Sequence, residues 1–163
     1  MAAGKDHVFG MANFQQIKED AMAEKIFAAT DKPACHVVRA GPAFTGKQGL
    51  TYAPGISAET AGSRALHLQL LTMPPGARAK AHRHEAHETA IYVLSGQSAM
   101  WHGDQLEHHM LAGAGDFVYI PAGVPHLPYN TSATQPCIAL ISRTDPNEQE
   151  SVELMPELEG LHR

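Results

Sequence analysis

Between residues 65 and 142 the sequence is divided into short runs of strand-forming residues, each closed by a turn signal. Leu66, Leu68 and Leu70 alternate with their neighbours in the two-residue period of a half-buried strand. Segments rich in Gly and Pro, such as 74–76 and 121–123, separate the runs. Many short strands without intervening helices indicate an antiparallel barrel or sandwich. The expected strands are residues 65–73, 89–95, 97–101, 106–111, 116–120 and 137–142.

The regions that flank these strands have different patterns. Residues 1–33 predict a helical extension, in which Asn13 is the N-cap of a segment with a helical period of apolar side chains. Residues 34–145 are expected to form the β-barrel, and 41–62 within them to be mostly loop with a short strand. Residues 146–163 are expected to form an acidic tail that packs on the barrel or swaps with it. The expected fold class is all-β, an antiparallel barrel with a short N-terminal helix.

Charge and the lengths of the apolar runs restrict the expected partners and location of the chain. The net charge is −5 and no cluster of Lys or Arg is present, so a nucleic-acid partner is not expected. No segment approaches the roughly 18 apolar residues of a membrane span. Residues 1–10 contain no apolar run like that of a secretory leader, so a cytoplasmic location is expected. Cys35 and Cys137 lie in apolar stretches and are expected to be buried thiols.

Histidine is concentrated in one part of the chain. Seven of the eleven histidines lie between positions 82 and 126, which indicates a local need for imidazole. The spacing of His82 and His84 places both side chains on one face of a strand. Glu88 has the same parity, and His126 lies on a separate run after Pro125. Three imidazoles and a carboxylate would bind one divalent transition metal ion (Fe, Mn, Zn or Ni) with open positions for a substrate.

These residues stand in a frame that resembles the two motifs of the cupin superfamily. The first motif runs from Gly76 through five residues to His82 and His84, and ends at Gly96. The second, residues 115–130, reads Gly, five residues, Pro-x-Gly, two residues, His, three residues, Asn. The resemblance implies a small RmlC-like jelly-roll barrel, the double-stranded β-helix of the cupins. The metal ligands that it implies are His82, His84, Glu88 and His126.

The spacing within the first motif leaves the third ligand open. Seven residues separate Glu88 from Gly96, where the family usually has six, so counting back from Gly96 arrives at Thr89. A one-residue bulge would restore Glu88, which is preferred because a carboxylate is a better metal ligand than a threonine hydroxyl. His87 is the alternative, and a site with three ligands is the remaining option.

Strand parity counted from Glu88 predicts the lining of a pocket for a small organic molecule. The expected lining is Ala90, Tyr92 and Leu94, with Leu66, Leu68, Leu70, Met100, Phe117 and Tyr119 as further candidates. The resemblance implies a metal-dependent protein that acts on such a molecule, and dioxygenase chemistry is favoured. A cupin isomerase or lyase, and a non-catalytic binding cupin, are the alternatives. The resemblance also implies a homodimer.

Overall fold

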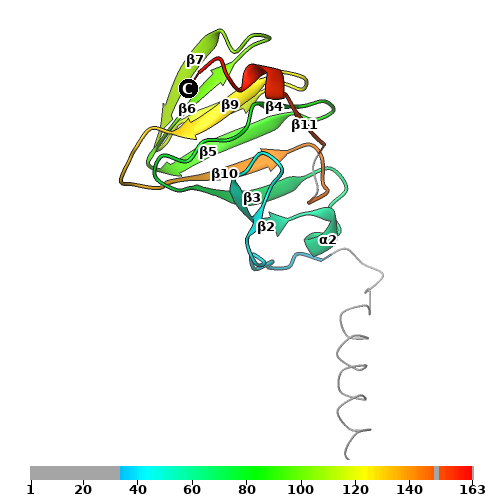
Figure 1. Ribbon diagram of the computed structural model, residues 1–163. Coiled ribbons are helices and arrows are strands. Elements are labelled where there is room, and N and C mark those ends of the chain that lie inside the picture. Colours follow the sequence, from blue (N-terminus) through cyan, green and yellow to red (C-terminus); the bar gives the residue numbers. More distant parts are fainter. Residues whose placement is uncertain (1–33, 149–150, 163) are drawn as a thin grey trace, which may run out of the picture. The chain divides into compact units, whose positions relative to one another are not determined.

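The computed structural model describes residues 34–148 and 151–162 (Figure 1). The chain divides into two compact units, Met1–Val37 and Val38–Arg163. The helix expected within residues 1–33 lies outside the described residues. Cys35, in the first unit, is exposed, which corrects the expectation that both thiols are buried. Within the described ranges no helix has the length and apolar character required to cross a membrane.

Two antiparallel sheets make up the second unit, and the predicted all-β barrel is confirmed. Sheet A has the strand order β1-β2-β3-β10-β5-β8, and sheet B has the order β11-β4-β9-β6-β7 (Figure 1). The strands of sheet A are β1 (Phe44–Thr45), β2 (Thr51–Ile56), β3 (His67–Met73), β5 (Thr89–Ser95), β8 (Phe117–Ile120) and β10 (Cys137–Arg143). Those of sheet B are β4 (His82–His84), β6 (Gln97–His102), β7 (His108–Gly113), β9 (His126–Asn130) and β11 (Val152–Leu154).

The six strands expected from the sequence agree with the structure to within two residues at each end. Residues 41–62 are more ordered than expected, because they form β1, β2 and the short helix α2 (Ala58–Ala61). A reciprocal capping box between Ser57 and Thr60 begins this helix, and Gly62, with φ of 65°, ends it. The strands β4 and β9, which carry histidines, are not among these six, although the spacing of His82 and His84 indicated an extended segment at β4.

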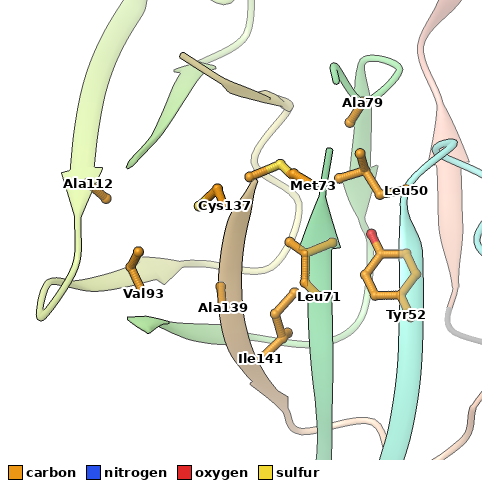
Figure 2. Close-up of a cluster of buried hydrophobic side chains, with 10 residues drawn as sticks. All are labelled: Leu50, Tyr52, Leu71, Met73, Ala79, Val93, Ala112, Cys137, Ala139 and Ile141. Carbon is orange, nitrogen blue, oxygen red and sulfur yellow. The ribbon is translucent and has the colours of Figure 1, made fainter. Parts of the chain in front are cut away.

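The main apolar core lies between the two sheets (Figure 2). Alternate residues of β10 and β3 point into it, and at one end Cys137 of β10 stands opposite Met73 of β3. Both side chains are almost completely buried, and burial of a side chain the size of Met stabilises the fold by about 1.5–3 kcal/mol. The core side chains drawn in Figure 2 are Leu50, Tyr52, Leu71, Met73, Ala79, Val93, Ala112, Cys137, Ala139 and Ile141.

The C-terminal segment packs on sheet B. β11 pairs with β4, and the 3-10 helix η1 (Pro156–Leu158) follows it. Leu158 is buried in a second, smaller apolar cluster with Ala81, Leu106 and Leu127. Leu127 directly follows His126, so this cluster lies on the side of sheet B that faces away from the barrel interior. The segment therefore covers the outside of the strands that carry the histidines.

Candidate metal centre

Three histidines come together from two neighbouring strands of sheet B. His82 and His84 lie two residues apart in β4, so their side chains point to the same side. His126 begins β9 and stands directly opposite His82 in the antiparallel pair. The ligand atoms of the three imidazoles all lie within 4.8 Å of one another. The structure thus brings together three of the four residues that the motifs indicate.

Backbone carbonyls orient two of these rings. Nδ1 of His82 lies 2.7 Å from the carbonyl oxygen of Lys80, and Nδ1 of His126 lies 2.9 Å from that of Val124. A ring nitrogen that faces a carbonyl oxygen donates its proton to it, so Nε2 keeps the free lone pair in both histidines. Each contact reaches back two residues along the chain, so the local backbone fixes both tautomer and ring orientation.

Burial keeps the three imidazoles neutral. Their exposed fractions are 3% for His82, 6% for His84 and 2% for His126. Burial, with a contribution from His84, lowers the pKa of His82 to about 4. Burial and the neighbouring imidazoles lower the pKa of His84 and of His126 to about 3. Three neutral nitrogen donors that converge in a buried site have the chemistry that a divalent transition metal requires.

Glu88 lies outside this group of ligand atoms. Thr89 points into the barrel with 5% of its surface exposed. The Glu88 carboxylate is exposed on the other side, where it accepts a hydrogen bond of 2.6 Å from the hydroxyl of Tyr119. The register shift between β5 and β10 falls between Val93 and Ser95, at the far end of the strand, so it does not turn Glu88 inward. Thr89 occupies the position reached by counting back from Gly96.

His87 is buried beside the three histidines. Its ring centroid is 4.6 Å from that of His84, and its Nδ1 lies 3.9 Å from the carboxylate of Asp145. His87 precedes β5, and its ligand atoms are not part of the converging group. The His87 ring therefore packs beside the His84 ring without joining the converging ligand atoms.

A polar layer that sequence reasoning missed lies on the inner side of sheet A. Arg143 of β10 stands opposite His67 of β3 and Thr89 of β5. The Arg143 guanidinium is buried and donates hydrogen bonds to the backbone carbonyls of Asn147 and Glu148. Burial, with a contribution from the positive charge of Arg143, lowers the pKa of His67 to about 4. Polar residues at alternate positions of residues 65–73 were the signal that could have identified this layer.

A cavity of about 70 Å³ extends from the three histidines between the sheets. Its walls are mostly apolar, and the described lining residues include no Asp, Glu, Lys or Arg. Gln69 and Thr89 line it, and within the described part of the chain Oε1 of Gln69 and Oγ1 of Thr89 have no hydrogen-bond partner. The cavity therefore offers two polar atoms to a ligand at its otherwise apolar wall.

The predicted lining is right for Met100 and wrong for the other eight candidates, Leu66, Leu68, Leu70, Ala90, Tyr92, Leu94, Phe117 and Tyr119. Leu71 and Gln69 of β3 line the cavity, whereas Leu70 points away from it. Because side chains alternate along a strand, an error of one position exchanges the two faces. We call the side of β3, β10, β5 and β8 that points away from the cavity the outer face of sheet A. Its large side chains are Leu68, Leu70, Tyr92, Leu94, Phe117, Tyr119, Ile138 and Leu140.

Two antiparallel sheets that enclose three converging imidazoles define a β-barrel with a candidate metal site. Residues 69–142 match the family model of the cupin domain. The chain therefore contains a cupin domain, as the two sequence motifs predicted. No curated protein shows significant sequence similarity to it.

Solved structures share this fold. A mutant of the oxalate decarboxylase OxdC from Bacillus subtilis has a TM-score of 0.59 at 21% identity, over 71% of this chain and 30% of that one. The present chain thus spans about a third of that protein. The polyketide cyclase RemF from Streptomyces resistomycificus has a TM-score of 0.57 at 26% identity, over 76% of this chain and 85% of that one. The Cnp3 cupin domain from Schizosaccharomyces pombe has a TM-score of 0.50 at 13% identity, over 59% and 61% of the two chains.

Proposed function

We propose that this protein is a metal-dependent enzyme that acts on a small organic molecule, with His82, His84 and His126 as the protein ligands of one divalent metal ion. The observation that carries this proposal is the convergence of three buried, neutral imidazoles at a mostly apolar cavity. Structural metal sites usually have four protein ligands, whereas catalytic sites leave positions open. A bound ion would supply Lewis-acid catalysis and, if it is redox-active, a means of reaction with dioxygen.

The charge of the site restricts the substrate. Three neutral ligands leave the double positive charge of a metal ion uncompensated, which favours a substrate that binds through an anionic oxygen or sulfur atom. Enolised diketones, aromatic diols and thiols are of this kind. The described cavity wall has no cationic side chain, so a second carboxylate of a dianion such as oxalate would be buried without a partner. A substrate with one anionic group and an apolar body suits the cavity best.

The cavity residues have separate roles in this proposal. The apolar wall, which includes Ile91 and Ile141, excludes water from the reacting centre. Gln69 and Thr89 orient the substrate through their two unpartnered polar atoms. The volume of about 70 Å³ is about half of the roughly 150 Å³ cavity that accommodates benzene, so small aliphatic substrates fit without movement of the wall. Larger rings require displacement of the flexible side chains of Met100 and Met110.

Oxidation of the substrate by dioxygen is the reaction that we favour. The resemblance to cupins with this ligand pattern supports it, because a site with three protein ligands can accept a substrate and dioxygen together. An isomerisation or cyclisation that consumes no oxygen is the second candidate. The similarity to the polyketide cyclase RemF, which extends over 85% of that chain at 26% identity, supports this alternative.

The experiment is anaerobic loading with iron, manganese, zinc or nickel, followed by oxygen-uptake measurements with small β-diketones, thiols and aromatic diols. We expect uptake with a redox-active metal and none in the His126→Ala variant. Substrate conversion without oxygen uptake would favour the isomerase or cyclase. Tight binding of a compound with no conversion under any metal would contradict the enzyme proposal and support a binding cupin. Glu88→Gln is the matched control, because this side chain lies outside the barrel.

A further inference from the structure

Four histidines form one row across sheet B. His82 of β4 stands directly opposite His126 of β9. His102 of β6 stands opposite His126 on one side and opposite His108 of β7 on the other. Directly opposite residues of antiparallel strands point to the same side of the sheet, so the row continues from the metal centre to the edge strand β7. The converging group contains the first two members of this row with His84, and it leaves His102 and His108 aside.

His102 and His108 lie at the turn of one hairpin. β6 ends at His102 and β7 begins at His108, so both stand at the rim of the barrel. His102 is half-buried, whereas 65% of the His108 side chain is exposed. Their ring centroids are 5.4 Å apart, compared with 5.1, 4.2 and 5.1 Å between the three rings of the metal centre. The pair therefore has nearly the ring separation of the histidines that converge in the metal centre.

This separation suits two ligands of one ion. A ring nitrogen binds zinc at about 2.0–2.1 Å, which places the ring centroid roughly 3.2 Å from the ion and two rings of a tetrahedral site about 5.2 Å apart. The observed separation of 5.4 Å between His102 and His108 agrees with this value. The register of β6 and β7 thus sets the backbone positions that two imidazole ligands require.

Glu107 supplies a third donor beside this pair. Its Oε1 atom lies 3.7 Å from Nε2 of His108. Its other oxygen, Oε2, accepts a hydrogen bond of 2.9 Å from the backbone N–H of Gln105, which holds the carboxylate within the turn. A Cβ atom at Gly103 would lie 2.5 Å from this Oε2, so the glycine leaves room for the carboxylate. The turn is therefore built around Glu107, with Oε1 directed toward the histidine.

The spacing of the donor atoms distinguishes this rim from the metal centre. Among the described residues only the metal centre forms a group of three ligand atoms within 4.8 Å of one another. Glu107 and His108 are exposed, so rotation about their side-chain bonds closes the wider gap at the rim when an ion binds. Neighbouring strands are about 4.8 Å apart, so the midpoint of His102 and His108 lies about 10 Å from that of His82 and His126. The ions of a two-metal centre are only about 3.5–4 Å apart, so the rim would form a separate site.

We propose that His102, His108 and Glu107 form a second binding site for a divalent transition metal ion at the rim of the barrel. Two imidazoles and a carboxylate suit zinc, copper or nickel, and the carboxylate offsets part of the charge of the ion. Water fills the remaining positions because the site is exposed, so the ion exchanges readily and binds more weakly than in the metal centre. This site does not depend on the proposed enzymatic function.

Zinc titration of the untagged full chain at neutral pH, followed by calorimetry, tests the proposal. We expect two ions per chain, which bind in a stronger and a weaker phase. The His102→Asn/His108→Asn double variant should lose the weaker phase, with its dissociation constant raised at least about 100-fold, and keep the stronger one. His126→Ala should do the reverse. His109→Asn is the matched control and should bind two ions, because this ring points to the opposite side of β7, where its Nε2 lies 3.1 Å from the Tyr129 hydroxyl.

A second variant tests the carboxylate. Glu107→Gln keeps the size of the side chain, and we expect it to raise the dissociation constant of the weaker phase about tenfold without a change in circular dichroism. An unchanged constant would overturn the assignment of Glu107. A wild-type chain that takes up no weaker ion, or an equal loss of the weaker phase in His109→Asn, would overturn the rim site. If the metal centre alone fails to bind, the stronger phase disappears and the weaker one remains, so the two proposals fail separately.

Discussion

The two faces of sheet A differ from those of most sheets, because polar side chains point toward the interior and large apolar side chains point outward. Toward the interior, β3, β5 and β10 present His67, Gln69, Thr89 and Arg143 among apolar residues. Toward the outside, the same strands present leucine, isoleucine and aromatic side chains. Buried polar groups destabilise a fold unless they gain partners, and exposed apolar patches leave hydrophobic surface in water. On the inner face, Gln69 and Thr89 offer two polar atoms to the substrate that we propose, whereas Arg143 donates hydrogen bonds to backbone carbonyls. On the outer face, large apolar side chains such as Leu94 and Phe117 stay exposed.

The largest expected effect concerns the inner face and metal binding. His126→Ala removes one of three converging ligands, and we expect the affinity for zinc or manganese to fall by more than about 100-fold. Metal content after dialysis and competition with a chromogenic chelator measure this. Glu88→Gln is the control and should leave the affinity within about twofold, because its carboxylate bonds to Tyr119 outside the barrel. An equal loss in both variants would return Glu88 to the ligand set.

Two adjacent leucines of β3 compare the faces directly. Leu71 is 4% exposed and lines the cavity, whereas Leu70 is 37% exposed on the outer face of sheet A. We expect Leu71→Ala to lower the free energy of unfolding of the subunit by about 2–5 kcal/mol. Leu70→Ala should lower it by less than about 1 kcal/mol, because this side chain is already partly exposed. Urea unfolding of the wild type and of the two variants measures both changes. Equal losses of unfolding free energy in the two variants would show that Leu70 stabilises the fold as much as Leu71 does.

Most of the fold was predictable because its signals are local. Each turn marked by Gly and Pro ends a strand, and the alternation within 65–73 marks one of the central strands. His82 and His84 share a face because the chain remains extended between them. His126 was identified through its motif, which includes the turn that aims it inward. These predictions needed only a few residues on each side.

The face on which Glu88 lies could not be predicted by counting from His84, because the chain bends between them. Residues 85–88 lie between β4 and β5, so the two-residue period that begins at His84 does not continue to Glu88. The apolar pattern of β10 did not correct the error, because Ile138 and Leu140 on one face are as apolar as Ala139 and Ile141 on the other. A strand with two apolar faces has no sequence signal that separates the face toward the cavity from the face toward the outside.

The third effect is the pH dependence of the polar layer. Burial lowers the pKa of His67 to about 4, and Arg143 adds to this against the opposing charges of Asp145 and Glu59. The unfolded chain binds a proton at this histidine below about pH 6.5, while the folded chain does so only near pH 4. The stabilising contribution is therefore complete above about pH 6.5 and falls by up to roughly 3 kcal/mol as the pH decreases to about 4.

The test of this pH effect is urea unfolding of the metal-free protein at neutral and at mildly acidic pH. His67→Gln removes the titrating group, so its stability should decrease less between the two conditions than that of the wild type. The remaining slope belongs to the other buried histidines, His82, His84 and His126. An unchanged slope in the variant would show that His67 is protonated equally in the folded and unfolded chains.

The smallest effect examines whether the polar atoms of the inner face are kept for a ligand. Oε1 of Gln69 is buried and has no hydrogen-bond partner among the residues that the structure describes. Gln69→Leu replaces the amide by an apolar group of similar size, so we expect the metal-free protein to gain about 1 kcal/mol of stability. Substrate affinity should fall at the same time, because the ligand loses an acceptor. Leu68→Gln, on the opposite face of the same strand, is the matched control. A loss of stability in Gln69→Leu would show that the amide is a structural group, and the orientation of the substrate would then rest on Thr89 alone.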